Sequence, residues 1–188
     1  MADSSTHLLP TKVEPDLTGS TVGRFTISAR LGAGGMGEVY RAEDKQLKRT
    51  VAIKRLAPRI RNDERYKKRF LREAQRASAL NHPHIAAIYD VLAEGDELFL
   101  VMEYVDGSTL RERMRRPISV SDFYPIAIQC SEALGAAHEK GILHGDLKPE
   151  NIMLTRAKSA VKMCDFGLAR RISTGGSTGF SRMTSGAM

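Results

Sequence analysis

One stretch decides how the whole chain is interpreted: His144-Gly145-Asp146-Leu147-Lys148-Pro149-Glu150-Asn151. It brings a carboxylate, an ammonium group and an amide together between Asp146 and Asn151. Pro149 fixes its own φ and disfavours helix at Lys148, so we expect an ordered, non-helical turn. These three groups suit phosphoryl transfer. A carboxylate can accept the proton of an attacking hydroxyl, an ammonium can neutralise the moving phosphate, and an amide oxygen can hold a metal ion.

A second acidic motif, Cys164-Asp165-Phe166-Gly167, lies 19 residues after Asp146. Two short apolar runs, 152–154 and 161–163, come between the two motifs and predict a small hairpin. The tripeptide Asp-Phe-Gly would often occur by chance, but this position after a predicted hairpin does not look accidental.

A glycine-rich run, with Gly32, Gly34 and Gly37 in a G-x-G-x-x-G pattern, lies between two strand-like segments. A dinucleotide-binding fold would need a helix after the glycines, and a P-loop would need Gly-Lys-Ser/Thr. Neither is present. The run therefore predicts a hairpin tip, which is either an ordinary turn or a loop whose backbone approaches phosphates.

The segment 51–54 is a short apolar strand that ends in Lys54, and residues 63–80 predict a helix. Phe70, Glu73, Ala77 and Leu80 share one face of that helix. An unpaired carboxylate on an apolar stripe is costly, so we expect Lys54 to pair with Glu73. The alternative for Lys54 is a strand lysine that faces solvent.

Two more strands are predicted at 86–91 and 97–103, followed by a helix at about 121–140. The apolar face of that helix carries Ile126, Cys130, Ala133, Leu134 and Ala137, and Gly141 ends it.

Length and composition predict one domain with a real core: 188 residues, of which 41% are hydrophobic and 27% charged. The net charge of +7 suits anionic partners such as ATP or acidic peptides. With no Trp and few aromatic residues, no nucleic-acid partner is predicted.

Cys130 and Cys164 show no metal-ligand spacing and predict free thiols in a reducing compartment. The sequence contains no signal peptide and no membrane-length apolar run, so we expect a cytoplasmic location, with an anchor elsewhere in a longer chain left open.

Taken in order, these motifs resemble eukaryotic-type (Hanks-type) Ser/Thr protein kinases over about residues 25–170. Lys148, two residues after Asp146, favours the Ser/Thr branch over tyrosine kinases. The amino-acid sequences of segments 31–40, 70–74 and 81–85 are most similar to those of bacterial members of the family. The resemblance implies an α+β, protein-kinase-like fold. We expect a disordered leader (1–22), a small lobe with a five-stranded antiparallel sheet and one helix (23–104), the start of the helical large lobe (105–167) and a partial activation segment (168–188).

The resemblance also implies transfer of the ATP γ-phosphate to Ser or Thr hydroxyls of protein substrates. In this reaction Asp146 would orient the hydroxyl and take its proton, and Lys148 would stabilise the phosphate charge. Lys54, fixed by Glu73, would position the α- and β-phosphates. The residues implied for Mg²⁺ are Asn151 and Asp165. The residues implied for nucleotide binding are Gly32, Gly34, Gly37, Val39, Ala52, Lys54, Met102, Glu103, Val105 and Met153.

Two departures from the family pattern matter. Gly145 stands where most members have the Arg that pairs with an activation-segment phosphate, so we expect activity that does not depend on that phosphate. The candidate acceptors there are Ser173, Thr174, Ser177, Thr178, Ser181, Thr184 and Ser185.

The chain also ends at Met188, before the expected Ala-Pro-Glu signature. This favours a piece of a longer kinase, with self-association through an uncovered face of helix 121–140. The alternative is an ATP-binding but inactive fragment or pseudokinase that acts as an interaction module. Cys164 would border the nucleotide, either as a site for covalent ligands or as an inert thiol.

Overall fold

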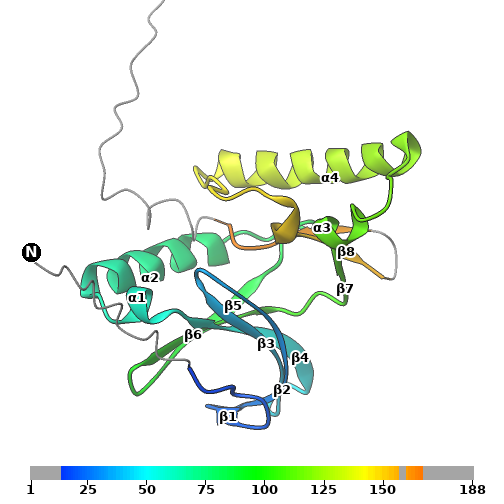
Figure 1. Ribbon diagram of the computed structural model, residues 1–188. Helices are drawn as coiled ribbons and strands as arrows, with labels where there is room; N and C mark the ends of the chain where they lie inside the picture. Colours follow the sequence, from blue (N-terminus) through cyan, green and yellow to red (C-terminus); the bar gives the residue numbers. More distant parts are fainter. Residues whose placement is uncertain (1–13, 157–159, 167–188) are drawn as a thin grey trace, which may run out of the picture.

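The computed structural model describes residues 14–156 and 160–166 (Figure 1). The predicted activation segment, with its seven candidate phosphate acceptors, and the first part of the predicted leader lie outside the described residues.

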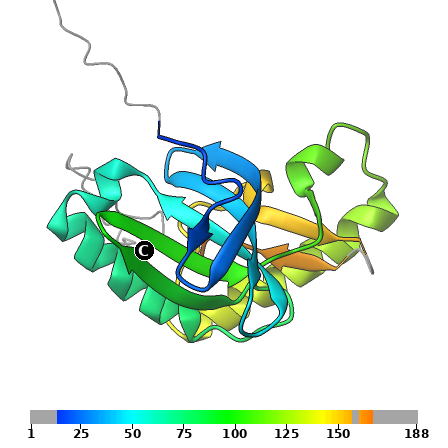
Figure 2. The same ribbon diagram turned by 90° about the horizontal axis from the view of Figure 1, so that it is seen from below.

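A six-stranded antiparallel sheet forms the first lobe. In spatial order its strands are β1 (Thr21–Val22), β2 (Phe25–Gly34), β3 (Gly37–Asp44), β4 (Arg49–Leu56), β6 (Glu97–Glu103) and β5 (Ile88–Glu94). The last five are the predicted strands, and β1 adds a sixth at the edge of β2. Figure 2, seen from below, shows this sheet in front and the second lobe behind.

The prediction that residues 1–22 form a disordered leader is wrong for residues 14–22. Val22 is buried in the core of the sheet and Leu17 packs against the same cluster. Glu14 forms ion pairs with Arg55 and Arg61. The ion-pair partners of Glu14, and the cluster residues Tyr40, Ile53 and Phe99, lie far along the chain, so the local composition that suggested disorder does not reveal these contacts.

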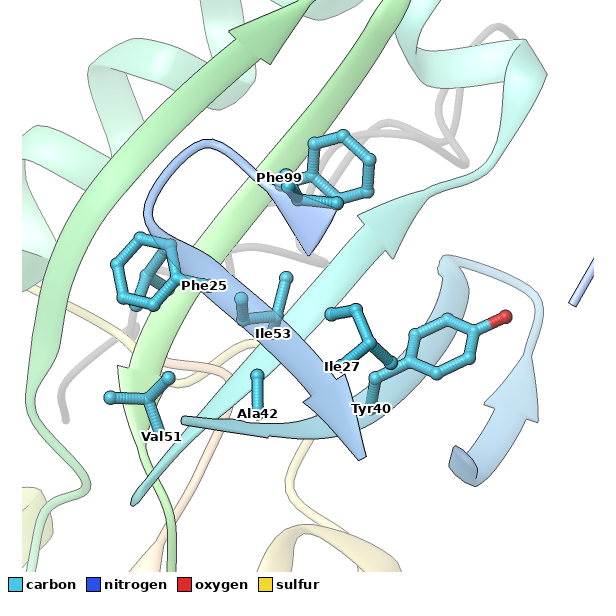
Figure 3. Packing of buried hydrophobic residues seen from close by; sticks show 9 residues of the cluster. Phe25, Ile27, Tyr40, Ala42, Val51, Ile53 and Phe99 are labelled. Atoms are coloured by element: carbon cyan, nitrogen blue, oxygen red, sulfur yellow. The ribbon is translucent and has the colours of Figure 1, made fainter. Parts of the chain in front are cut away.

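Alternation along the strands separates two cores. Phe25, Ile27, Tyr40, Ile53 and Phe99 belong to the cluster on one face of the sheet (Figure 3). The other face carries a second cluster, which packs against helices α1 (Pro58–Arg61) and α2 (Glu64–Ser78). Because successive strand residues point to opposite faces, Lys54 lies on the face of the second cluster and its neighbours Ile53 and Arg55 lie on the first.

Helix α2 begins where the sequence predicts, because the Asp63 side chain accepts hydrogen bonds from the backbone N–H groups of Arg65 and Tyr66. Its buried residues are Phe70, Ala74 and Ala77.

The second lobe combines a three-stranded sheet with helices. The sheet is β7 (Gly107–Thr109), β8 (Ile152–Thr155) and β9 (Val161–Met163), and the helices are α3 (Leu110–Arg113), α4 (Val120–Glu139) and the short 3₁₀ helix η1 (Pro149–Asn151). In the described ranges 14–156 and 160–166, no helix is both long and apolar enough to span a membrane.

The predicted apolar face of α4 is covered, contrary to expectation. Ile126, Ala133 and Ala137 are buried in a cluster with Val161 and Met163 of β9. The sequence prediction assumed that only later helices could cover this face, whereas the β8–β9 hairpin and the segment after α2 do so. A different set of apolar side chains on α4 is 54–69% exposed: Val120, Phe123, Tyr124 and Ile128.

This exposed stripe gives a first testable prediction. The pair of substitutions Tyr124→Glu and Ile128→Lys places an i,i+4 ion pair on the helix and removes two exposed apolar side chains. We expect it to weaken self-association of the chain about tenfold, as measured by sedimentation velocity over a concentration series. Leu47→Glu is the control, because Leu47 is 57% exposed but lies in the turn between β3 and β4. Equal self-association of the unmodified chain, the double variant and Leu47→Glu would contradict the prediction.

Candidate active site

The loop 144–151 forms a turn that is held together by its own hydrogen bonds. The Lys148 Nζ donates to Asp146 Oδ2 at 2.6 Å, and the Asn151 Nδ2 donates to the Asp146 carbonyl oxygen at 2.9 Å. Pro149 begins η1, where its missing N–H removes no hydrogen bond. Gly145 has φ of +81°, in the region that favours glycine. The three predicted catalytic-loop residues are thus brought together.

The electrostatics of this turn follow from the Asp146–Lys148 contact. The hydrogen bond from Lys148 lowers the pKa of Asp146, and the same bond raises the pKa of Lys148. Both groups are therefore charged at neutral pH. Their side chains are 32% and 44% exposed, so a substrate can reach them from solvent.

A second charged contact joins the two lobes. The Lys54 Nζ lies 2.7 Å from Asp165 Oδ2, and these side chains are only 6% and 14% exposed. The other carboxylate oxygen, Asp165 Oδ1, is buried and has no hydrogen-bond partner among the described residues 14–156 and 160–166. A buried carboxylate oxygen without a donor is a suitable ligand for a hard cation such as Mg²⁺. The donor set at this position therefore fits the predicted metal.

The two predicted magnesium ligands are tied together by the backbone. The Cys164 N–H donates to the Asn151 carbonyl oxygen at 2.8 Å, which holds Asp165 beside the catalytic loop. Within the described part of the chain, no group of three or more His, Cys, Asp or Glu side chains forms a metal cluster. A metal here would use Asn151 and Asp165 and take its other ligands from substrate or water.

The predicted Lys54–Glu73 pair is wrong for this structure. Glu73 lies 3.5 Å from Arg76 on the same helix, and Lys54 engages Asp165 instead. The reason is the position of the buried stripe on α2. At about 100° per residue from Phe70, the buried Ala77 and Ala74 lie at about −20° and +40° around the helix axis. Glu73 lies at about −60°, just beyond the edge of that stripe.

The predicted nucleotide-binding side chains gather on one face of the large sheet. Strand register places Val39 opposite Lys54 and Ala52 opposite Met102. Directly opposed residues point to the same face, so these four side chains are neighbours. Ala52 and Met102 are buried, and Val39 packs against the same cluster.

The glycines of the β2–β3 hairpin are positioned differently from one another. A Cβ at Gly32 or Gly34 would meet no atom of the described residues within 4 Å, so the backbone is open at both positions. Gly37 has φ of +131°, and a Cβ there would meet the Arg55 carbonyl oxygen at 1.9 Å. Only Gly37 is therefore required by the packing of the chain itself.

The segment that connects the lobes carries the remaining predicted positions. Glu103 ends β6, Val105 follows it and Met153 lies in β8; all three are half-buried. The Glu103 carboxylate binds Lys162 Nζ at 2.8 Å and accepts the Ala87 N–H at 3.1 Å. Sequence reasoning missed Lys162. The available signal was its position between two buried residues of β9 and close before Asp165.

His144 is a second residue that the sequence reasoning did not assign. It is buried, and its ring lies 4.6 Å from the ring of Phe166, measured between centroids. Burial lowers the pKa of His144, so the ring is neutral at pH 7. This contact packs the catalytic loop against the Asp165 motif.

Cys164 gives a second testable prediction. Burial of the thiol and the nearby Asp165 carboxylate raise the pKa of Cys164 to about 12. At pH 8 the thiolate fraction should be about 10³-fold below that of an ordinary cysteine. In a Cys130→Ala variant, where Cys164 is the remaining thiol, we expect iodoacetamide to react about 10³-fold faster after denaturation than in the native protein. A native rate within tenfold of the denatured one would favour the covalent-ligand site instead.

Known proteins are similar to this chain in sequence and in structure. The family model described as "Protein kinase domain" matches residues 25–186. A probable serine/threonine-protein kinase of Streptomyces coelicolor is 44% identical over 165 residues, which cover 83% of this chain and 24% of that protein. Serine/threonine-protein kinase PrkC of Bacillus subtilis is 43% identical over 154 residues, covering 81% of this chain and 24% of PrkC.

A solved structure is also similar. The kinase domain of Mycobacterium tuberculosis PknI superposes with a TM-score of 0.70 and 34% identity, covering 81% of this chain and 63% of that one. The chain thus spans about a quarter of the length of the two relatives and under two thirds of the solved domain.

Proposed function

The chain belongs to the protein kinase family, and on this premise we propose that it transfers the γ-phosphate of ATP to Ser or Thr hydroxyls of protein substrates. The substrate hydroxyl would lie at the exposed side of the Asp146–Lys148 pair. Asp146 orients this hydroxyl and accepts its proton, because its carboxylate is ionised at neutral pH. Lys148 stabilises the negative charge on the transferring phosphoryl group.

The nucleotide would lie between the glycine-rich hairpin and the second lobe. Its base would contact Val39, Ala52, Met102 and Met153, with the backbone of Glu103 and Val105 at its edge, and its phosphates would lie below Gly32, Gly34 and Gly37. Asn151 and Asp165 would hold Mg²⁺, which supplies charge neutralisation for the phosphates. Lys54 would bind the α- and β-phosphates. Catalysis here depends on positioning and on charge stabilisation.

One observation carries the proposal. A continuous series of contacts runs from Asp146 to Asn151, from Asn151 to the Cys164 N–H, and from the adjacent Asp165 to Lys54. It connects Asp146, Asn151, Asp165 and Lys54, four of the groups that phosphoryl transfer requires. Two free, half-buried thiols suit a reducing, ATP-containing compartment, so we place this activity in the cytoplasm.

A specific observation favours the alternative, an ATP-binding module that does not transfer phosphate. Active protein kinases need the lysine–glutamate pair, whereas Lys54 here engages Asp165 and Glu73 engages Arg76. Transfer would therefore require Glu73 to reach Lys54 once nucleotide is bound.

Two measurements distinguish phosphate transfer from ATP binding without transfer. Isothermal titration of the chain with ATP and Mg²⁺ tests nucleotide binding, and transfer from γ-labelled ATP to a Ser- and Thr-rich protein tests catalysis. We expect both to succeed. Binding without transfer would support the alternative, and no binding would refute both.

A further inference from the structure

Four charged side chains form a closed ring on the face of β4 opposite to Lys54. Arg55 Nη2 lies 2.6 Å from Glu97 Oε1 and 2.8 Å from Glu14 Oε2. Arg61 Nη2 lies 2.6 Å from Glu14 Oε1, and Arg61 Nη1 contacts the Glu97 carboxylate. Each glutamate thus bridges both arginines. Glu14 precedes the segment that matches the kinase family model, 25–186.

The two arginines of the ring are buried and the glutamates are 22% and 26% exposed, so the arginine charges depend on the carboxylates beside them. The Arg55 and Arg61 side chains are 6% and 9% exposed. The hydrogen bond to Glu97 raises the pKa of Arg55. If Glu14 lost its charge, two buried guanidinium groups would share one close carboxylate, which is unfavourable.

The ring is connected to the glycine-rich hairpin through Glu38, the residue after Gly37. Glu38 Oε2 lies 3.8 Å from Arg55 Nη1 and accepts the Tyr40 hydroxyl at 2.8 Å. Arg30 also contacts the Glu38 carboxylate.

The strand end that carries the ring also holds the tip of the hairpin. The Ala57 N–H donates to the Met36 carbonyl oxygen at 3.1 Å, and Arg59 donates to the Gly35 carbonyl oxygen. Gly37 packs directly against the Arg55 backbone. The position of segment 35–38 is therefore set by segment 55–61, whose two ends, Arg55 and Arg61, are the arginines of the ring.

Residues 14–17 contact this assembly at two further points. The Pro15 carbonyl oxygen accepts a hydrogen bond from Arg55 Nη1 at 3.0 Å, and Leu17 packs against the cluster that contains Tyr40. Arg55 and Tyr40 are two of the partners of Glu38. The segment before β1 therefore supports the groups that hold the hairpin carboxylate.

We propose that Glu14 is a positioning residue for the glycine-rich hairpin: through Arg55 and Arg61 it fixes the strand end to which residues 35–38 are attached, and it thereby strengthens nucleotide binding. The effect on nucleotide rests on the proposed function. The effect on hairpin order does not.

The test uses Glu14→Gln in the full chain, with Glu43→Gln as the matched control. Glu43 lies on β3 like Glu38, but it is half exposed and outside the ring. Amide hydrogen exchange without nucleotide should become about tenfold faster at residues 32–38 in Glu14→Gln, with α4 unchanged. The dissociation constant for ATP with Mg²⁺ should rise about fivefold. The control should match the unmodified chain in both.

A second variant separates positioning from charge balance. Glu14→Gln combined with Arg61→Met removes one charge of each sign, so the melting temperature should recover while exchange at 32–38 stays fast. Uniformly faster exchange, or unchanged exchange at 32–38 in a folded Glu14→Gln protein, would overturn the proposal, as would equal ATP affinity. If the unmodified chain bound no ATP, the proposed function would fail, and exchange at 32–38 would still decide whether Glu14 positions the hairpin.

Discussion

Replacing Asp165 by Asn should abolish the stabilisation of this chain by ATP and Mg²⁺ and should also destabilise the chain itself. The carboxylate is the partner of the buried Lys54 ammonium, and its other oxygen, which has no hydrogen-bond partner in the part of the chain that the structure describes, fits a metal ligand. Breaking a buried pair from one side leaves an uncompensated charge, at a cost of about 3 kcal/mol. For a chain of this size that corresponds to a fall in melting temperature of about 10 °C. Asn is the appropriate replacement because Asp165 has φ of 62°, which Asn tolerates and Ala does not.

The measurement is thermal unfolding with and without ATP and Mg²⁺. Asp106→Asn serves as control, because its ion pair with Arg156 is 65% and 79% exposed and should contribute less than about 1 kcal/mol. Combining Asp165→Asn with Lys54→Met removes both buried charges, so the double variant should be more stable than Asp165→Asn alone. If the two single effects simply added, Lys54 and Asp165 would not act as a pair.

The sequence identifies the local structure of the site well, because each motif carries its own backbone requirement. Pro149 and Gly145 define the catalytic turn, and the continuous apolar runs 51–53 and 98–102 predict the buried strands that carry Ala52 and Met102. The residues that define each of these patterns are close in sequence, so the patterns can be recognised from the sequence alone.

Contacts between distant segments are not encoded in this way. Lys54 and Asp165 are 111 residues apart, and nothing near either one shows that they meet. Helical periodicity placed Glu73 on the apolar stripe but could not tell the centre of that stripe from its edge. The ring of Glu14, Arg55, Arg61 and Glu97 joins the first described residue to two strands and a short helix. Its members look like ordinary surface charges in sequence.

Replacing Asp146 by Asn should lower the rate of phosphate transfer about 10³-fold and leave ATP affinity within about threefold. The variant keeps the size of the side chain but cannot accept the proton of the substrate hydroxyl. Removing a positioned general base lowers a reaction rate by about 10²–10⁴-fold. It also removes the charge that holds Lys148 at 2.6 Å. The measurement is the initial rate of transfer from γ-labelled ATP, beside titration of ATP binding.

Glu150→Gln is the control for damage to the loop, because Glu150 lies in the same turn but binds the exposed Arg111. Its transfer rate should equal that of the unmodified chain. Since Lys148 lowers the pKa of Asp146, that carboxylate stays ionised as the pH falls from 8 to 6, and acidification over this range should not reproduce the loss. An Asp146→Asn protein that retained more than a tenth of the transfer rate would show that another group accepts the proton. An unmodified chain that bound ATP without any transfer would instead favour the arrangement in which Lys54 remains with Asp165.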